Sequence, residues 1–287
     1  MSYRRRASPL HAARAGAGCA YCLALAIAAL MFSNPVALGA VVLAVAAAGT
    51  AAGVGRELRR ASVFAVPLAV MVALINALVT RDGLTVIVRL GDLPVLGHTD
   101  VTLEATAYGA VLGLRALALI LCGALYTAAV DPDEVMALFR RWSYRSALTA
   151  TIATRMVPVL VRDSRRLADA QRCRPGRPPS RMALARASTA GVLDRALDVA
   201  AALEVRGYGA ARRPPRSRRP YSRHDLAFYA SSIALVALAA GARVWGLAPL
   251  QAYPSLHAPV DAGVLALAAA IVACVLAPFS DRRGIER

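Results

Sequence analysis

Six long apolar blocks, separated by short polar joints, dominate the pattern of this 287-residue chain. The hydrocarbon core of a bilayer requires about 20 apolar residues in a helix, with a range of about 17–25. Lipid offers no partner to a backbone N–H or C=O group, so blocks of this length must cross the membrane as α-helices. The pattern therefore predicts an all-α polytopic membrane protein with six spans, at 16–32, 35–54, 63–79, 105–130, 226–245 and 261–278.

Two segments between these spans are polar enough to lie outside the bilayer. The larger one divides the chain into a four-span region at 1–130, an extramembrane section at 131–225 and a two-span region at 226–287. The smaller one, at 80–104, has a β-branched run at 85–88 followed by Gly91-Asp92 as a turn signal. This segment is a small hairpin at the membrane surface or a re-entrant stretch, and the β-branched run favours the hairpin.

The extramembrane section separates into three helical pieces. The first begins at Asp131-Pro132, with Asp at the N-cap and Pro at N1, and covers 132–142. The second covers 146–174, with Pro158 as a kink or a junction, and the third covers 180–206 and ends at Gly207. The two long helices have apolar faces too broad for solvated helices, so we expect them to contact a protein partner or each other. Ion pairs at i, i+3 in the second piece are expected for Asp163–Arg166 and Asp169–Arg172.

The charged residues predict the orientation of the chain. All 34 basic residues are arginine, and 17 acidic residues leave a net charge of +17. With six spans, thirty arginines fall on the side of the termini and of the section at 131–225, and only Arg81 and Arg89 fall on the opposite side. The positive-inside rule then places both termini and this section in the cytoplasm, for a multi-pass protein of the cell (inner) membrane.

The sequence offers few groups for catalysis. Without lysine there can be no P-loop, so any ATP would be hydrolysed on another chain. The four histidines show no metal-ligand spacing, and the lone pair Cys19 and Cys22 begins an apolar block. We therefore expect no enzymatic activity, no cofactor and no metal site. Arg115 lies inside the fourth span, where it is either a functional intramembrane charge or close enough to an interface to snorkel.

Both long helices of the extramembrane section end in a related pattern. The run 155–160, Arg-Met-Val-Pro-Val-Leu, leads through Asp163, Arg166 and 170–172 to Cys173-Arg174-Pro175-Gly176. The other helix ends with Ala-Leu-Glu-Val-Arg-Gly at 202–207. Together with Gly91, Glu104, Gly113 and Arg115 in and before the fourth span, these stretches resemble the T component (EcfT, or CbiQ in cobalt systems) of energy-coupling factor (ECF) transporters.

In that family, each of two coupling helices ends in an Ala-Arg-Gly signature. In this sequence Cys173 stands for the first alanine and Pro175 separates Arg174 from Gly176, whereas the second signature keeps Arg206-Gly207 with Val205 for alanine. The second signature is therefore the closer match.

The resemblance implies a transport function without chemistry on this chain. A T component transmits the motion of two ABC ATPase subunits to a separate small membrane subunit, the S component, which binds a vitamin or a transition-metal ion. Forked guanidinium groups suit ion pairs with acidic grooves on the ATPases. The partner-binding residues that the resemblance implies are Arg174, Gly176, Arg206, Gly207, Gln171 and Glu204.

Two other functions compete with this interpretation. One is a permease subunit of another transporter class that carries substrate through its own spans, although those spans contain few polar residues. The other is a basic membrane-anchored protein that binds nucleic acid. The chain lacks the interleaved aromatic residues and the recognised modules of such proteins, so we expect no nucleic-acid partner.

Overall fold

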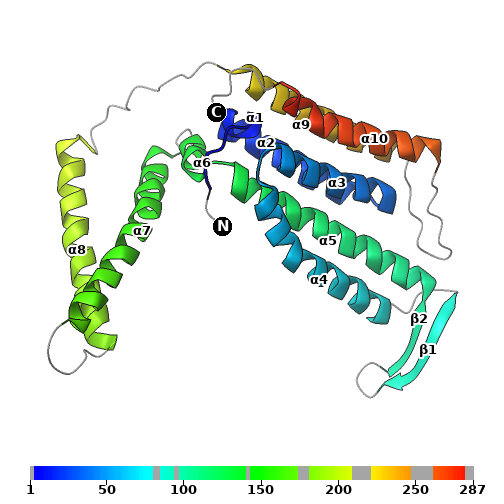
Figure 1. The fold of residues 1–287 in the computed structure, drawn as a ribbon, viewed down its shortest axis with the longest axis horizontal. Helices are drawn as coiled ribbons and strands as arrows, with labels where there is room; N and C mark the ends of the chain where they lie inside the picture. The colour runs from blue at the N-terminus through cyan, green and yellow to red at the C-terminus, as the bar shows by residue number, and fades with distance from the viewer. Residues whose placement is uncertain are drawn as a thin grey trace. The chain divides into compact units, whose positions relative to one another are not determined.

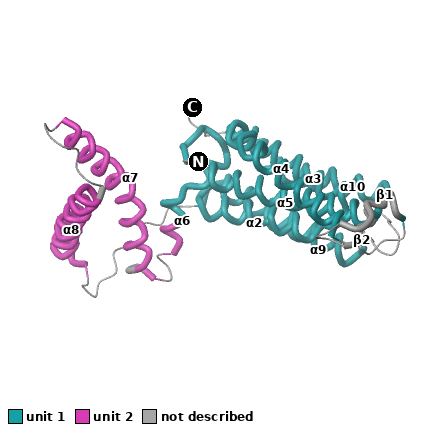
Figure 2. The backbone as a smooth tube through the Cα atoms, turned by 90° about the horizontal axis from the view of Figure 1, so that it is seen from below, with its two compact units in different colours: residues 1–135, 221–287 teal, residues 136–220 magenta. Residues whose placement is uncertain are grey.

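The computed structural model describes residues 3–79, 85–93, 97–139, 143–173, 181–208, 221–246 and 261–281. These residues divide into two compact units, which Figure 2 colours separately. Unit 1 comprises Met1–Val135 together with Tyr221–Arg287, and unit 2 comprises Met136–Pro220. Unit 2 is therefore a continuous segment inserted into the sequence of unit 1.

Six apolar helices run side by side in unit 1 (Figure 1). Four of them are long and apolar enough to cross a membrane: α4, α5, α9, and α10 with its 3-10 extension η1. The helices α2 and α3 are equally apolar but have 17 residues each. Every predicted span thus corresponds to a helix, and the chain is a polytopic α-helical membrane protein. The bounds in unit 1 are α1 Pro9–Ala12, α2 Ala15–Met31, α3 Pro35–Ala51, α4 Gly55–Val79, α5 Leu103–Ala129, α9 Arg223–Val244, α10 Ala262–Leu276 and η1 Ala277–Phe279.

The start of α4 differs from the sequence prediction. Residues 56–60, which lie between the predicted spans 35–54 and 63–79, form the first turns of this 25-residue helix. Arginine, glutamate and leucine are all good helix formers. Leu58 is buried while Arg56, Arg59 and Arg60 are exposed. This amphipathic turn therefore extends the apolar helix at its N-terminal end. The third membrane helix is therefore longer than the predicted span at 63–79.

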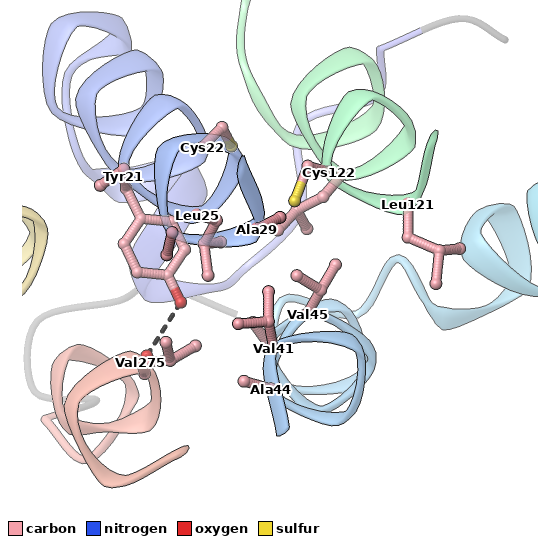
Figure 3. Close-up of a cluster of buried hydrophobic side chains, with 14 of the residues drawn as sticks. Tyr21, Cys22, Leu25, Ala29, Val41, Ala44, Val45, Leu121, Cys122 and Val275 are labelled. Carbon is pink, nitrogen blue, oxygen red and sulfur yellow. Dashed lines mark hydrogen bonds between the residues drawn. The ribbon is translucent and has the colours of Figure 1, made fainter. Parts of the chain in front are cut away.

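The core of unit 1 lies among α2, α3, α5, α9 and α10, where small apolar residues and a few aromatic rings are buried (Figure 3). Tyr21 of α2 is fully buried, and its hydroxyl donates a 2.9 Å hydrogen bond to the carbonyl of Val275 in α10. Its ring contacts Phe228 of α9 edge-on, with 5.1 Å between the ring centroids. A polar group inside a membrane protein has to find its partner within the protein, and Tyr21 does so while joining three helices.

Helices α4 and α5 approach each other more closely than ordinary side chains would allow. A Cβ atom added at Gly109 of α5 would lie 2.5 Å from the carbonyl oxygen of Ala73, and one added at Gly113 would collide with the carbonyl oxygen of Ala69. In membranes, small residues spaced four apart let helix backbones pack directly on each other. The larger apolar residues of α4, such as Phe64 and Leu74, are exposed on its outer side.

The segment before α5 forms the predicted hairpin. Strands β1 (Val86–Leu93) and β2 (Gly97–Thr102) pair in antiparallel fashion. The turn prediction was wrong, because Gly91-Asp92 lies inside β1, at a register shift between Arg89 and Asp92. Glycine inside a strand often marks such a bulge. The buried carboxylate of Glu104 accepts a 2.9 Å hydrogen bond from the Thr85 hydroxyl and so ties the base of the hairpin to α5.

Two long helices make up most of unit 2. Helix α7 (Tyr144–Arg172) and helix α8 (Arg181–Val205) pack against each other. Helix α7 continues through Pro158, so this proline does not mark a junction between two helices. Before α7, the helix α6 (Pro132–Phe139) crosses the boundary between the units, and the last predicted residues of this helix, 140–142, lie outside the described part of the chain.

One of the two predicted ion pairs in α7 is wrong. Asp169 and Arg172 pair at 3.6 Å, as expected for neighbouring turns. Asp163 instead forms an ion pair with Arg195 of α8. The pair links the two helices because both side chains lie along their contact, where each is only about one-third exposed.

Candidate partner-binding site

The C-terminal end of α8 is a tightly terminated helix end. Gly207 has a φ of 76°, a left-handed conformation that side chains with a Cβ rarely adopt. The N–H group of Tyr208 bonds to the Leu203 carbonyl, and the N–H group of Gly207 bonds to the Glu204 carbonyl, both at 2.8 Å. This pair of bonds is the Schellman motif, in which glycine reverses the chain directly after the helix. The predicted helix end at Gly207 is thus confirmed.

Three of the predicted partner-binding residues gather at this end. Glu204, Arg206 and Gly207 are all exposed, and the Schellman turn holds Arg206 as the residue that joins helix to turn. A guanidinium on a terminated helix end is attached to a fixed backbone and offers five N–H donors. Such a group is well placed to bind a carboxylate on another protein.

Of the other predicted residues, only Gln171 lies in the described part of the chain, near the C-terminal end of α7. Gln171 is half-buried near the end of α7, and Cys173 caps that helix with its backbone N–H bonded to Asp169 and Gln171 carbonyls. Arg174 and Gly176 follow in the chain but lie outside the described residues. Since α8 has 25 residues, the two ends are about 37 Å apart along its axis at 1.5 Å per residue. The described residues thus place Gln171 and Arg206 on the ends of two different helices.

Helices α7 and α8 both expose large apolar side chains. Leu193 and Leu197 of α8 are each 64% exposed, whereas Val199 and Leu203 are partly buried. Val157 of α7 is also exposed. The two helices do contact each other, but Leu193 and Leu197 of α8 remain exposed. An apolar surface of this kind on helices rich in arginine marks an interaction site.

Arg115 has a structural role that the sequence did not reveal. It lies near the middle of α5, and its Nη2 donates a 3.0 Å hydrogen bond to the carbonyl of Phe32, the C-cap of α2. The carbonyl groups at a helix end lack intrahelical partners and carry the negative end of the helix dipole. Arg115 therefore stabilises the turn between α2 and α3.

Sequence reasoning missed a polar network at the start of α2. The N–H of Arg14 donates to Asp225 of α9 at 2.7 Å, and the N–H of Ala15 donates to Glu134 of α6 at 3.1 Å. One signal for it was readable, because Ser222 and Asp225 have the spacing of a capping box, which the structure contains. Nothing in the sequence indicated that Asp225 also reaches another helix 211 positions away.

The N-terminal segment is bound to the same end of unit 1. Arg6 donates to the Gly53 carbonyl and forms an ion pair with Glu57 at the start of α4. His11 is buried, with its Nδ1 2.7 Å from the Ser8 hydroxyl. Burial, followed by the nearby charge of Arg6, lowers the pKa of His11. The imidazole therefore stays neutral at pH 7 and adds no charge to this network.

The described residues contain no group of three or more His, Cys, Asp or Glu side chains that could hold a metal ion. Comparison with models of protein families finds one match, over residues 6–216, to CbiQ, described as a cobalt transport protein. No curated protein matches the chain. The matched range covers the first four membrane helices, the hairpin and both long helices of unit 2.

Proposed function

The chain belongs to the CbiQ cobalt transport protein family, and from this premise we propose that it is the T component of an ECF-type ABC importer. In this proposal it sits in the cell (inner) membrane with both termini and unit 2 in the cytoplasm. Two ATPase subunits bind to unit 2, and a separate small membrane subunit carries the substrate. The chain itself catalyses no reaction and binds no cofactor.

The observation that carries this proposal is the pair of helix ends in unit 2. The Arg206-Gly207 end of α8 is exposed and rigidly terminated, and the end of α7 that leads to Arg174 lies about 37 Å away along α8. Two separated contact points suit two ATPase subunits better than one. A pair of packed helices between these points can pass a movement at either end to the other.

The exposed stripe of α8 supports a further partner. Leu193, Leu197 and Val205 of α8 are exposed, and exposed apolar residues gathered on one helix favour a contact with another protein. In the proposed assembly the substrate-binding subunit or the ATPases cover this stripe.

The family description makes cobalt the first substrate to test, and a vitamin the second. The test is to co-express the chain with the ATPases and small membrane protein of its own organism and to purify the chain from the membrane. We expect both ATPases and the small protein to co-purify. Proteoliposomes that contain the whole complex should accumulate radioactive Co²⁺ only when ATP is supplied on the side of unit 2.

Two results would contradict the proposal. The chain alone could transport substrate in proteoliposomes, which would make it a permease. Alternatively, the purified chain could retain none of the ATPases under conditions in which it remains folded. Uptake of a labelled vitamin instead of Co²⁺ would keep the T-component function and change only the substrate.

A further inference from the structure

The first turn of α2 is capped by carboxylates from two distant helices. A helix begins with N–H groups that have no intrahelical partner, and the N-cap residue Arg14 provides no side-chain cap. The Asp225 carboxylate accepts a 2.7 Å hydrogen bond from the N–H of Arg14, and the Glu134 carboxylate accepts a 3.1 Å hydrogen bond from the N–H of Ala15. Both are anions at the positive end of the helix dipole, where negative charge is stabilised.

These two carboxylates come from the two places where the chain leaves and rejoins unit 1. Glu134 lies in the first turn of α6, directly before the boundary at Val135. Asp225 lies in the first turn of α9, shortly after the chain returns at Tyr221. The start of α2 therefore holds both ends of the inserted segment that forms unit 2.

The two attachments differ in strength. Asp225 is 1% exposed and also accepts the Ser222 N–H at 2.9 Å, while the Arg14 guanidinium lies 3.5 Å from it and 4.4 Å above the Tyr221 ring. Several partners thus hold the start of α9, where the chain returns to unit 1. Glu134 is exposed and reaches α2 by this hydrogen bond, so it is the attachment that a movement of unit 2 can strain or release.

We infer that the start of α2 is the mechanical anchor of unit 2, and that Glu134 is a positioning residue that passes the movement of unit 2 to the membrane helices. This inference rests on the proposed function. Helix α2 packs against α5 and α9 in the core of unit 1, so a pull on its first turn acts on the packed bundle and not on a loose loop. Asp225 supplies the fixed point, and Glu134 supplies the link to the moving segment.

The test compares Glu134→Ala and Glu134→Gln with the wild-type chain in the complete complex, reconstituted in liposomes. The control is Asp261→Ala, which removes an exposed carboxylate at the N-cap of α10 where the side chain makes no cap hydrogen bond. The readouts are thermal stability, ATPase co-purification, ATP hydrolysis and Co²⁺ imported per ATP hydrolysed, with the KM for ATP as a further check.

We expect Glu134→Ala to keep its stability, its bound ATPases and its KM for ATP. Co²⁺ imported per ATP should fall about fivefold or more, the lower end of the usual range of coupling between sites. Glutamine keeps an oxygen acceptor for the Ala15 N–H, so Glu134→Gln should retain more than half of the wild-type ratio. Asp261→Ala should behave as the wild type.

An unchanged import ratio in Glu134→Ala would overturn the inference while leaving the proposed function intact. A loss accompanied by lower thermal stability or by release of the ATPases would also overturn it, because it would indicate a purely structural role. If the wild-type complex itself shows no ATP-dependent import of Co²⁺ or a vitamin, the proposed function fails and the inference fails with it.

Discussion

Two helix pairs in this protein expose large apolar residues, but for different reasons. In unit 1, α4 buries a row of alanines against Gly109 and Gly113 of α5 and turns its larger residues outward. After Arg60 this outward face carries no charge as far as Val79. In unit 2, the exposed leucines of α8 and valines of α7 alternate with arginines and aspartates, and neither helix qualifies as a membrane span.

The difference shows that exposure alone does not identify a binding surface in a membrane protein. Lipid covers the outward face of α4, because an uninterrupted apolar helix finds its solvent in the bilayer. Lipid cannot cover α8 in the same way, since its charges would have to enter the bilayer too. In the proposed function, the exposed residues Leu193 and Leu197 are therefore the surface at which we expect a protein partner.

The largest expected effect compares two leucines, one from each unit. Leu25 of α2 is fully buried in the core, and Leu25→Ala should destabilise the chain by about 2–5 kcal/mol through lost contacts and a cavity. Leu197→Ala removes an exposed side chain and should change stability by less than about 0.5 kcal/mol. Thermal unfolding of the purified chain in detergent measures both changes.

In a binding experiment the order of the two effects should be reversed, with a larger loss for Leu197→Ala than for Leu25→Ala. Leu197→Ala should reduce co-purification of the partner subunits. If the double variant with Leu193→Ala and Leu197→Ala left partner binding unchanged, α8 would not be the surface that a partner covers. The proposed difference between the exposed apolar residues of the two units would then be contradicted.

A smaller effect is expected at the contact between α4 and α5. Gly113→Leu places a side chain where even a Cβ atom would collide with a backbone carbonyl, so the helices must separate, at a cost of about 1–3 kcal/mol. Gly123→Leu is the matched control, because it lies on the same helix with no atom within 4 Å of an added Cβ. Equal melting temperatures for the two variants would show that α4 and α5 do not pack through this glycine.

A local loss of stability is expected at the end of α8. Gly207→Ala places a Cβ in a left-handed conformation, which costs about 1–2 kcal/mol locally. The last turn should fray, with faster amide hydrogen exchange at Gly207 and Tyr208, while the core of unit 1 keeps its protection. Unchanged exchange at these two amides would mean that the Schellman turn does not hold Arg206 in place.

The positions of the helices could be predicted from the sequence because length and composition decide them. The apolar blocks identify all six membrane helices, Asp131-Pro132 identifies the start of α6, and Gly207 identifies the end of α8. The β-branched run at 85–88 correctly indicated a hairpin. Each of these features depends on residues that are close together in the chain.

What the sequence could not provide are contacts between distant residues. Asp163 has Arg166 one turn away but pairs with Arg195 on the next helix. Arg115 reaches the Phe32 carbonyl, and Asp225 reaches the start of α2. In each case a local partner or a solvated position was equally compatible with the pattern, and only helix packing selects the partner observed.

The most direct test of the proposed function is charge reversal at Arg206. Arg206→Glu should reach the membrane in normal amounts, yet lose ATPase binding and ATP-dependent uptake in the complete complex. The reason is that the new glutamate would repel the acidic groove expected on the ATPase. Arg174→Glu should have a smaller effect, since Pro175 interrupts the signature there, and Arg186→Glu, an exposed arginine within α8, should have little. If Arg206→Glu still assembled with the ATPases and supported uptake at the level of Arg186→Glu, the coupling function of this helix end would be contradicted.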